Sequence, residues 1–169
     1  MKHLVFLILM MCTITAVSAQ EMSRKERKAA KEKALIETTK TLIDAQNWQF
    51  NAHQMLPMQG KSKTLTTLYH VVLKNDTVDS YLPFYGRAYH VDYGSTDSPM
   101  TFKAKISDYT QKPAKKGGWI IQFSTKNKND VLQYSFAVSE NGTATLNVSS
   151  TNRQSISYYG KIVEIEGHD

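Results

Sequence analysis

The sequence has a single cysteine among its 169 residues, at position 12. Cys12 falls inside an apolar stretch, residues 4–16, which follows a charged start and ends in the small residues Val17–Ala19. This order is typical of a secretory signal peptide. We therefore expect cleavage between Ala19 and Gln20, and a periplasmic or secreted protein. The 150 residues after position 19 contain no cysteine, which excludes disulfides, thiol nucleophiles and thiolate metal sites from the mature chain.

No apolar run is long enough to predict a membrane anchor. The stretch 4–16 is shorter than the roughly 20 apolar residues that a spanning helix requires, and it includes Thr13 and Thr15. Cys12 follows two methionines rather than a small residue at a cleavage point, so lipid attachment is not expected either. We predict an exported protein without a lipid anchor.

Established catalytic motifs are missing as well. The sequence has no Gly-x-Ser-x-Gly elbow, phosphate-binding glycine loop, His-Glu-x-x-His or calcium-binding loop pattern. His53, His70 and His90 are too far apart in sequence to define a metal set, and no cofactor is expected. His90 and Asp92 are spaced as an acid–base pair, which leaves a weak hydrolase as a third hypothesis. The favoured expectation is a protein that is not an enzyme.

Positive charge is in modest excess and unevenly placed. The formal net charge is +6, and it falls to +5 once Lys2 is removed with the signal segment. A surplus of +3 lies within residues 21–33, and the rest of the chain is nearly balanced. This distribution does not predict nucleic-acid binding. It is compatible with a solvated spacer or with peripheral contact to an anionic component of the cell envelope.

Glycine and proline are scarce, and neither occurs between residues 24 and 46. Ser23 and Glu26 form a capping-box pattern, so one helix is predicted over Ser23–Gln46. Its first half is charged nearly all round and is expected to project or fray. Its second half has helical apolar spacing and is expected to pack on the domain, through Leu35, Ile36, Thr39, Leu42 and Ile43.

After position 47 the apolar period changes from helical to alternating, which predicts strands. The expected strands cover approximately residues 48–57, 65–73, 77–82, 102–113, 119–125, 131–139, 143–149 and 155–165. Asn75-Asp76 predicts a turn, and Asn141-Gly142 predicts a type I′ hairpin turn. Because nearly every connection is short, we expect an antiparallel meander of about seven or eight strands that closes into a small barrel. A two-sheet sandwich is the alternative.

These patterns divide the chain into three parts: a signal peptide at 1–19, a basic helix at 20–47 and a single β-barrel domain at 48–169. Within the barrel domain, Leu82–Tyr89 is the densest cluster of possible ligand-binding side chains. Its aromatic rings can stack on a ligand, and its arginine can donate two parallel hydrogen bonds to an anion. The candidate ligand-binding residues are Tyr85, Arg87, Tyr89, Arg153 and Tyr158. The competing interpretation is that these rings fill the core and that Arg87 caps a carbonyl.

The segment Leu82–Tyr89, the basic opening Ser23–Lys28, and Asn152-Arg153-Gln154 with Tyr158 and Gly160 together resemble a family of small exported Bacteroidetes proteins. It is the domain-of-unknown-function family 4251. The resemblance implies a lipocalin-like β-barrel behind one helix, located in the periplasm or at the envelope. It implies no catalytic residue.

The sequence thus predicts a non-enzymatic binding or envelope-accessory protein, with an apolar or amphipathic small ligand held inside the barrel. The alternative is a structural or protein-interaction module with a packed interior and a basic docking helix.

Overall fold

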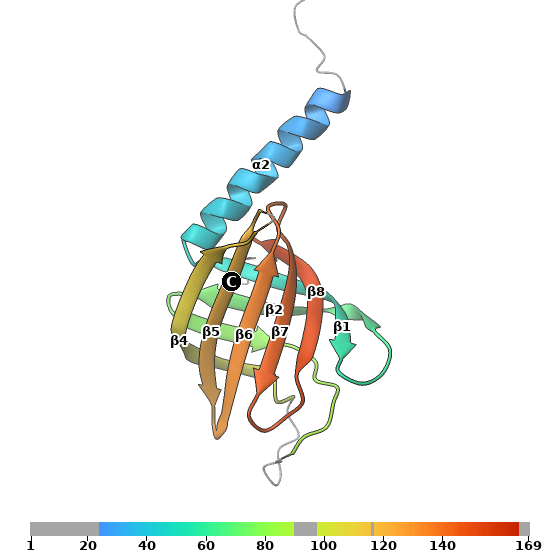
Figure 1. The fold of residues 1–169 in the computed structure, drawn as a ribbon, viewed down its shortest axis with the longest axis vertical. Helices are drawn as coiled ribbons and strands as arrows, with labels where there is room; N and C mark the ends of the chain where they lie inside the picture. Colours follow the sequence, from blue (N-terminus) through green and yellow to red (C-terminus); the bar gives the residue numbers. More distant parts are fainter. Residues whose placement is uncertain (1–23, 90–97, 116, 166–169) are drawn as a thin grey trace, which may run out of the picture. The chain divides into compact units, whose positions relative to one another are not determined.

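The structure is a computed structural model that describes residues 24–89, 98–115 and 117–165. Within these ranges one helix precedes eight strands (Figure 1). In chain order the elements are α2 (Arg24–Asp44), β1 (Trp48–Pro57), β2 (Lys63–Lys74), β3 (Thr77–Tyr81), β4 (Thr101–Pro113), β5 (Trp119–Asn127), β6 (Asp130–Val138), β7 (Thr143–Ser150) and β8 (Ile156–Val163). The signal segment and cleavage site predicted at 1–20 lie outside the described residues.

The strands form a closed antiparallel barrel in which each strand pairs with its neighbours in sequence (Figure 1). The first and last strands close the ring, with Gln49 opposite Val163 at one end of the seam and Pro57 opposite Ile156 at the other. Closure pairs the outer strands of the meander, which would otherwise expose unpaired backbone groups. The predicted barrel is confirmed, and the sandwich alternative is not.

The two hairpin turns singled out from the sequence differ in conformation. Asn75 and Asp76 both have positive φ, at 50° and 55°, as a two-residue type I′ turn between β2 and β3 requires. At the second hairpin only Gly142 has positive φ, at 78°. The amide of Gly142 bonds to the Ser139 carbonyl at 2.9 Å, so this loop has three residues and a glycine bulge. The type I′ prediction at Asn141-Gly142 was wrong.

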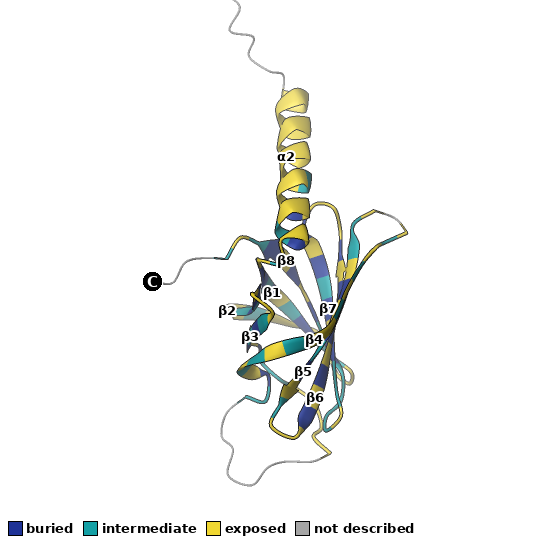
Figure 2. Cartoon of the chain, turned by 90° about the vertical axis from the view of Figure 1, so that its left-hand side faces the viewer, coloured by how far each residue is buried: buried dark blue, intermediate teal, exposed yellow. Residues whose placement is uncertain are grey.

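Large side chains fill the inside of the barrel. Phe136 of β6 lies at the centre, with its ring 5.0 Å from that of Trp48, 5.5 Å from Phe50 and 6.0 Å from Phe123. Tyr134 stacks on Phe123 at 5.0 Å. Buried and exposed positions alternate along β5 and β6, as expected for strands with one face in the core (Figure 2). The interior is therefore a packed core in which a group of aromatic rings lies among aliphatic side chains.

The last turns of α2 belong to the same compact unit as the barrel, which comprises Ala34–Asp169. Ile43 is fully buried in the core, and Thr39 lies against Gly142 in the β6–β7 connection. Asp44 accepts a hydrogen bond from Gln111 of β4 at 3.0 Å. The predicted helix and its packing second half are thus observed. Leu35 departs from the prediction, because it is 46% exposed.

Candidate ligand-binding strap

The long connection between β3 and β4 is anchored in the core at both of its ends. Leu82 and Met100 are fully buried, and the Leu82 amide bonds to the Met100 carbonyl at 3.3 Å. Ser98 donates its hydroxyl to the Leu82 carbonyl at 2.9 Å. The chain therefore leaves and re-enters the barrel wall at one fixed point.

Residues Pro83–Tyr89, which we call the strap, run from this point to the β7–β8 connection. The Tyr89 amide bonds to the Asn152 carbonyl at 2.7 Å. Arg87 and Gln154 exchange two bonds of 3.1 Å, one between backbone groups and one from the Arg87 amide to the Gln154 side chain. Because the β3–β4 and β7–β8 junctions are opposite each other in an eight-strand ring, the strap crosses one end of the barrel.

The strap turns part of its surface toward the core. Phe84 packs against the core cluster, and Gly86 has the Phe84 ring and the Gln154 side chain close to its α-carbon. Tyr158, on the inner face of β8, donates its hydroxyl to the Pro83 carbonyl at 2.7 Å. These contacts hold the strap backbone in place, so its remaining side chains project from a fixed support.

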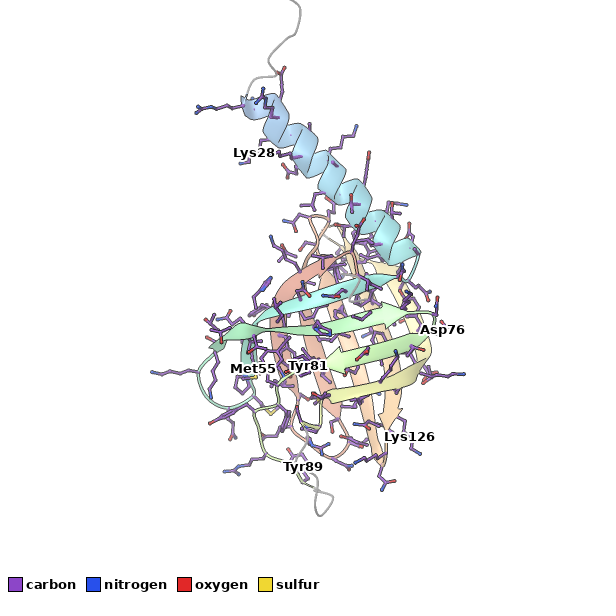
Figure 3. The ribbon with its side chains drawn as sticks, turned by 180° about the vertical axis from the view of Figure 1, so that it is seen from behind. Lys28, Met55, Asp76, Tyr81, Tyr89 and Lys126 are labelled. Carbon is purple, nitrogen blue, oxygen red and sulfur yellow. The ribbon has the colours of Figure 1, made fainter. Side chains whose placement is uncertain are left out.

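Three side chains at alternate positions of the strap remain accessible. Tyr85 is 55% exposed and Tyr89 is 66% exposed, and Arg87 between them is also exposed. Within the described ranges, the Arg87 guanidinium forms no hydrogen bond or ion pair. Lys63, at the start of β2, places its Nζ 3.5 Å from the centre of the Tyr85 ring. In Figure 3 Tyr89 lies at the lower end of the barrel, beyond Tyr81 at the end of β3.

Arg153, predicted as a second ligand-binding cation, is paired with Asp130. Its Nη1 lies 2.5 Å from the Asp130 carboxylate, and the two side chains are only 17% and 6% exposed. The same carboxylate accepts hydrogen bonds from the hydroxyls of Ser150 and Thr151 and from the amide of Asn152. The pair therefore fixes the loop that holds the strap, and sequence spacing gave no sign of Asp130 as its partner.

Tyr158, also predicted to bind a ligand, is part of the core instead: its side chain is fully buried and its hydroxyl is bonded to the Pro83 carbonyl. Burial raises the pKa of the Tyr158 phenol well above its ordinary value, with a smaller contribution from Tyr134. Tyr109 of β4, half-buried, has its pKa raised to about 12, mainly by burial and further by the charge of Asp44. Of the five candidate residues, three are accessible and two hold the strap and its anchor in place.

No catalytic centre is apparent in the described part of the chain. His90 and Asp92, the proposed acid–base pair, lie outside the described residues. His53 and His70 are on β1 and β2, and no group of three metal-ligating side chains occurs among the residues that the structure describes. Within the same ranges, no helix combines the length and apolar character needed to cross a bilayer.

Comparison with known proteins agrees with this architecture. The sequence model of the domain of unknown function DUF4251 matches residues 30–162. The chain belongs to the DUF4251 family. A crystal structure of a DUF4251 family protein from Bacteroides eggerthii superimposes with a TM-score of 0.60, covering 80% of this chain and 91% of that one. At 15% identity this likeness shows the shared fold alone. No curated protein matches the sequence.

Proposed function

We propose that this DUF4251 protein is an exported, non-enzymatic binding protein that holds an amphipathic, negatively charged ligand on the outer side of the strap. The observation that carries the proposal is the combination of a fixed strap backbone with three accessible side chains, Tyr85, Arg87 and Tyr89. Packing does not require these side chains, because the inward positions at this end are already occupied by Leu82, Phe84 and Tyr158.

The chemistry of the strap favours one class of ligand. A guanidinium without a protein partner donates bidentate hydrogen bonds to carboxylate or phosphate oxygens. Exposed phenol rings on either side supply flat apolar surfaces that stack on a sugar or another ring. Lys63 adds a second positive charge next to the Tyr85 ring. A ligand with an apolar face and an anionic group fits this arrangement better than a wholly apolar molecule.

The packed interior supports an external site over the internal one expected from the sequence. An eight-stranded barrel either fills its interior with side chains or encloses one small ligand. Here the rings of Trp48, Phe50 and Phe123 each pack against the ring of Phe136. A molecule placed there would have to displace aromatic rings that are no more than 2% exposed.

The test uses acidic oligosaccharides as probes, with glucuronic-acid oligomers compared against uncharged glucose oligomers by titration calorimetry and native mass spectrometry. Binding of the charged series alone, weakened by Arg87→Gln and by Tyr85→Ala, is the expected result. Arg27→Gln in α2 and Tyr159→Ala on β8, where Tyr159 is 43% exposed, serve as matched controls. If Arg87→Gln bound the glucuronic-acid oligomers as tightly as the wild type, the proposal would be wrong.

A second function is favoured by the charge of the first turns of α2. Residues 24–33 contain six basic residues and two acidic ones, all within one continuous helix. Such a segment suits docking to an acidic partner or an anionic envelope surface. Removing Gln20–Lys33 distinguishes the two functions: docking requires that partner capture is lost while the melting temperature and ligand binding at the strap are retained.

A further inference from the structure

The connections between strands lie at two opposite ends of the barrel. Because every strand runs antiparallel to its neighbours in the closed ring, the β1–β2, β3–β4, β5–β6 and β7–β8 connections share one end. We call it the strap end, since the strap is part of the β3–β4 connection. The last turns of α2 pack at the other end, where Thr39 lies against Gly142. Figure 3 shows Met55, near the end of β1, on one side of the barrel and Asp76, between β2 and β3, on the other.

The β1–β2 loop, residues 58–62, and the strap belong to one continuous surface. Lys63, the first residue of β2, places its Nζ 3.5 Å from the centre of the Tyr85 ring. On the other side of the loop, Pro57 at the end of β1 pairs with Ile156 at the start of β8. The β7–β8 connection just before Ile156 bonds to the strap. Both flanks of the loop are therefore tied to the strap or to its anchor.

The strap end exposes large apolar side chains. Within the described ranges, four such side chains are more than half exposed. Three of them belong to connections of this end: Met58 in the β1–β2 loop, at 65%, and Tyr85 and Tyr89 in the strap. The fourth is Leu68, on β2. An exposed apolar surface bordered by polar groups marks a site of contact with a protein or a membrane.

The charges in the connections of the strap end have one sign. The described residues of these four connections contain no aspartate or glutamate and four basic residues: Lys61, Arg87, Lys128 and Arg153. Arg153 is paired with Asp130, and the other three are exposed. The connections of the opposite end, by contrast, include Asp76 and Glu140. The strap end is thus both apolar and basic, and an anionic, amphipathic partner matches it.

We propose that the strap end docks on the surface of an anionic lipid bilayer. The side chains of Met58, Tyr85 and Tyr89 enter the interface, and Lys61 and Arg87 contact the headgroups. This inference rests on the proposed function and names the source of its amphipathic, negatively charged ligand. Tyrosine rings are enriched at membrane interfaces, where one end is apolar and the other is hydrated. Basic residues near the surface add attraction to anionic lipids.

The placement of apolar and basic residues favours a bilayer over an acidic protein. Each exposed apolar side chain has a basic residue within three positions, Lys61 after Met58 and Arg87 between Tyr85 and Tyr89. The pairs come from separate connections. A bilayer presents anionic headgroups above apolar chains at every point of its surface, so each pair meets the same environment. A protein partner would have to supply a separate matching site for each.

Sedimentation of the mature chain with vesicles measures this docking, with phosphatidylglycerol mixed into phosphatidylcholine and phosphatidylcholine alone as the comparison. Lys61→Glu changes the local charge by two units and should lower partitioning onto the anionic vesicles about thirtyfold, at roughly fivefold per unit charge. Lys74→Glu, at the opposite end of β2 and also exposed, is the matched control. In about 0.1 M salt the Debye length is about 10 Å, so this distant change should have little effect.

The apolar contribution is tested in the same way. Met58→Ser should weaken partitioning, whereas Ile120→Ser, at an exposed position near the start of β5 and thus at the opposite end, should not. Met58→Trp measures insertion: its fluorescence should shift to shorter wavelength on anionic vesicles and be quenched by lipids brominated in the acyl chains. Each substituted side chain is exposed, so the barrel should fold in every variant.

Three results would overturn the proposal: no binding of the wild type to anionic vesicles, equal losses in Lys61→Glu and Lys74→Glu, or a Met58→Trp spectrum that vesicles leave unchanged. Binding that is lost only in Arg27→Gln would assign docking to α2 and overturn it too. Titration with glucuronic-acid oligomers needs no bilayer. Oligomer binding without vesicle binding would therefore reject the bilayer and leave the proposed function standing, whereas the absence of both would reject both.

Discussion

Replacing Asp130 by asparagine tests whether the buried ion pair fixes the strap. Asp130→Asn keeps the size of the side chain but removes the charge that Arg153 faces at 2.5 Å. The Asp130 side chain is only 6% exposed and that of Arg153 17%, so water replaces little of the lost interaction. Breaking a buried pair by removing one partner costs about 3–5 kcal/mol. Because Arg153 is partly exposed, we expect the free energy of unfolding to fall by an amount near the lower end of this range, about 3 kcal/mol.

For a chain of this size, that loss corresponds to a fall in melting temperature of about 6–12 °C. Calorimetry measures the melting temperature, and urea unfolding measures the free energy of unfolding. Amide hydrogen exchange at Arg87, Tyr89 and Gln154 should become faster, because the hydrogen bonds of Asp130 hold the loop that bonds to the strap. Asp44→Asn, at the exposed pair with Lys40, is the contrast and should change stability little. A loss below about 1 kcal/mol for Asp130→Asn, or unchanged exchange in the strap, would refute the reasoning.

Three further predictions concern the wall and the core. Gly160→Ala should prevent folding, since an added Cβ would lie 2.0 Å from the Asn51 carbonyl oxygen; circular dichroism of the purified variant checks this, and a native-like spectrum would contradict it. Tyr158→Phe should cost about 1 kcal/mol in urea unfolding by removing the bond to Pro83, and an unchanged midpoint would show that this bond contributes nothing. Burial raises the pKa values of Tyr134 and Tyr158 above the ordinary 10.0, so their protonated forms favour the folded state. That contribution is complete below pH 10 and is lost as the pH rises beyond it, so spectrophotometric titration should show these phenols ionising only as the barrel unfolds.

Much of the fold followed from local patterns in the sequence. The change from helical to alternating apolar spacing near position 47 located the helix and the strands, because burial on one face imposes a period of 3.6 or 2. Short connections predicted antiparallel neighbours and hence closure. The error at Asn141-Gly142 has a local cause: this pair suits a two-residue turn, but the register of β6 and β7 leaves three residues in the loop, and only Gly142 adopts positive φ.

The candidate site was predicted in part. Composition singled out Tyr85, Arg87 and Tyr89, since aromatic rings around an arginine are conspicuous in any sequence. It could not tell which side chains the fold would bury. Arg153 and Tyr158 looked equivalent to the others, yet one is paired with Asp130 and the other is fully buried. Lys63 carries no distinguishing pattern in sequence, and only folding brings it to the Tyr85 ring.

The sequence by itself determined that a helix precedes a meander of strands and that this meander has one apolar face to bury. Those features depend on neighbouring residues along the chain. Whether the interior would be filled, which end the strap would cross, and which cations would be left unpaired were decided by tertiary structure. Phe136, Asp130 and Lys63 acquire their roles from residues far away in sequence, through packing and pairing distances that only the closed barrel sets.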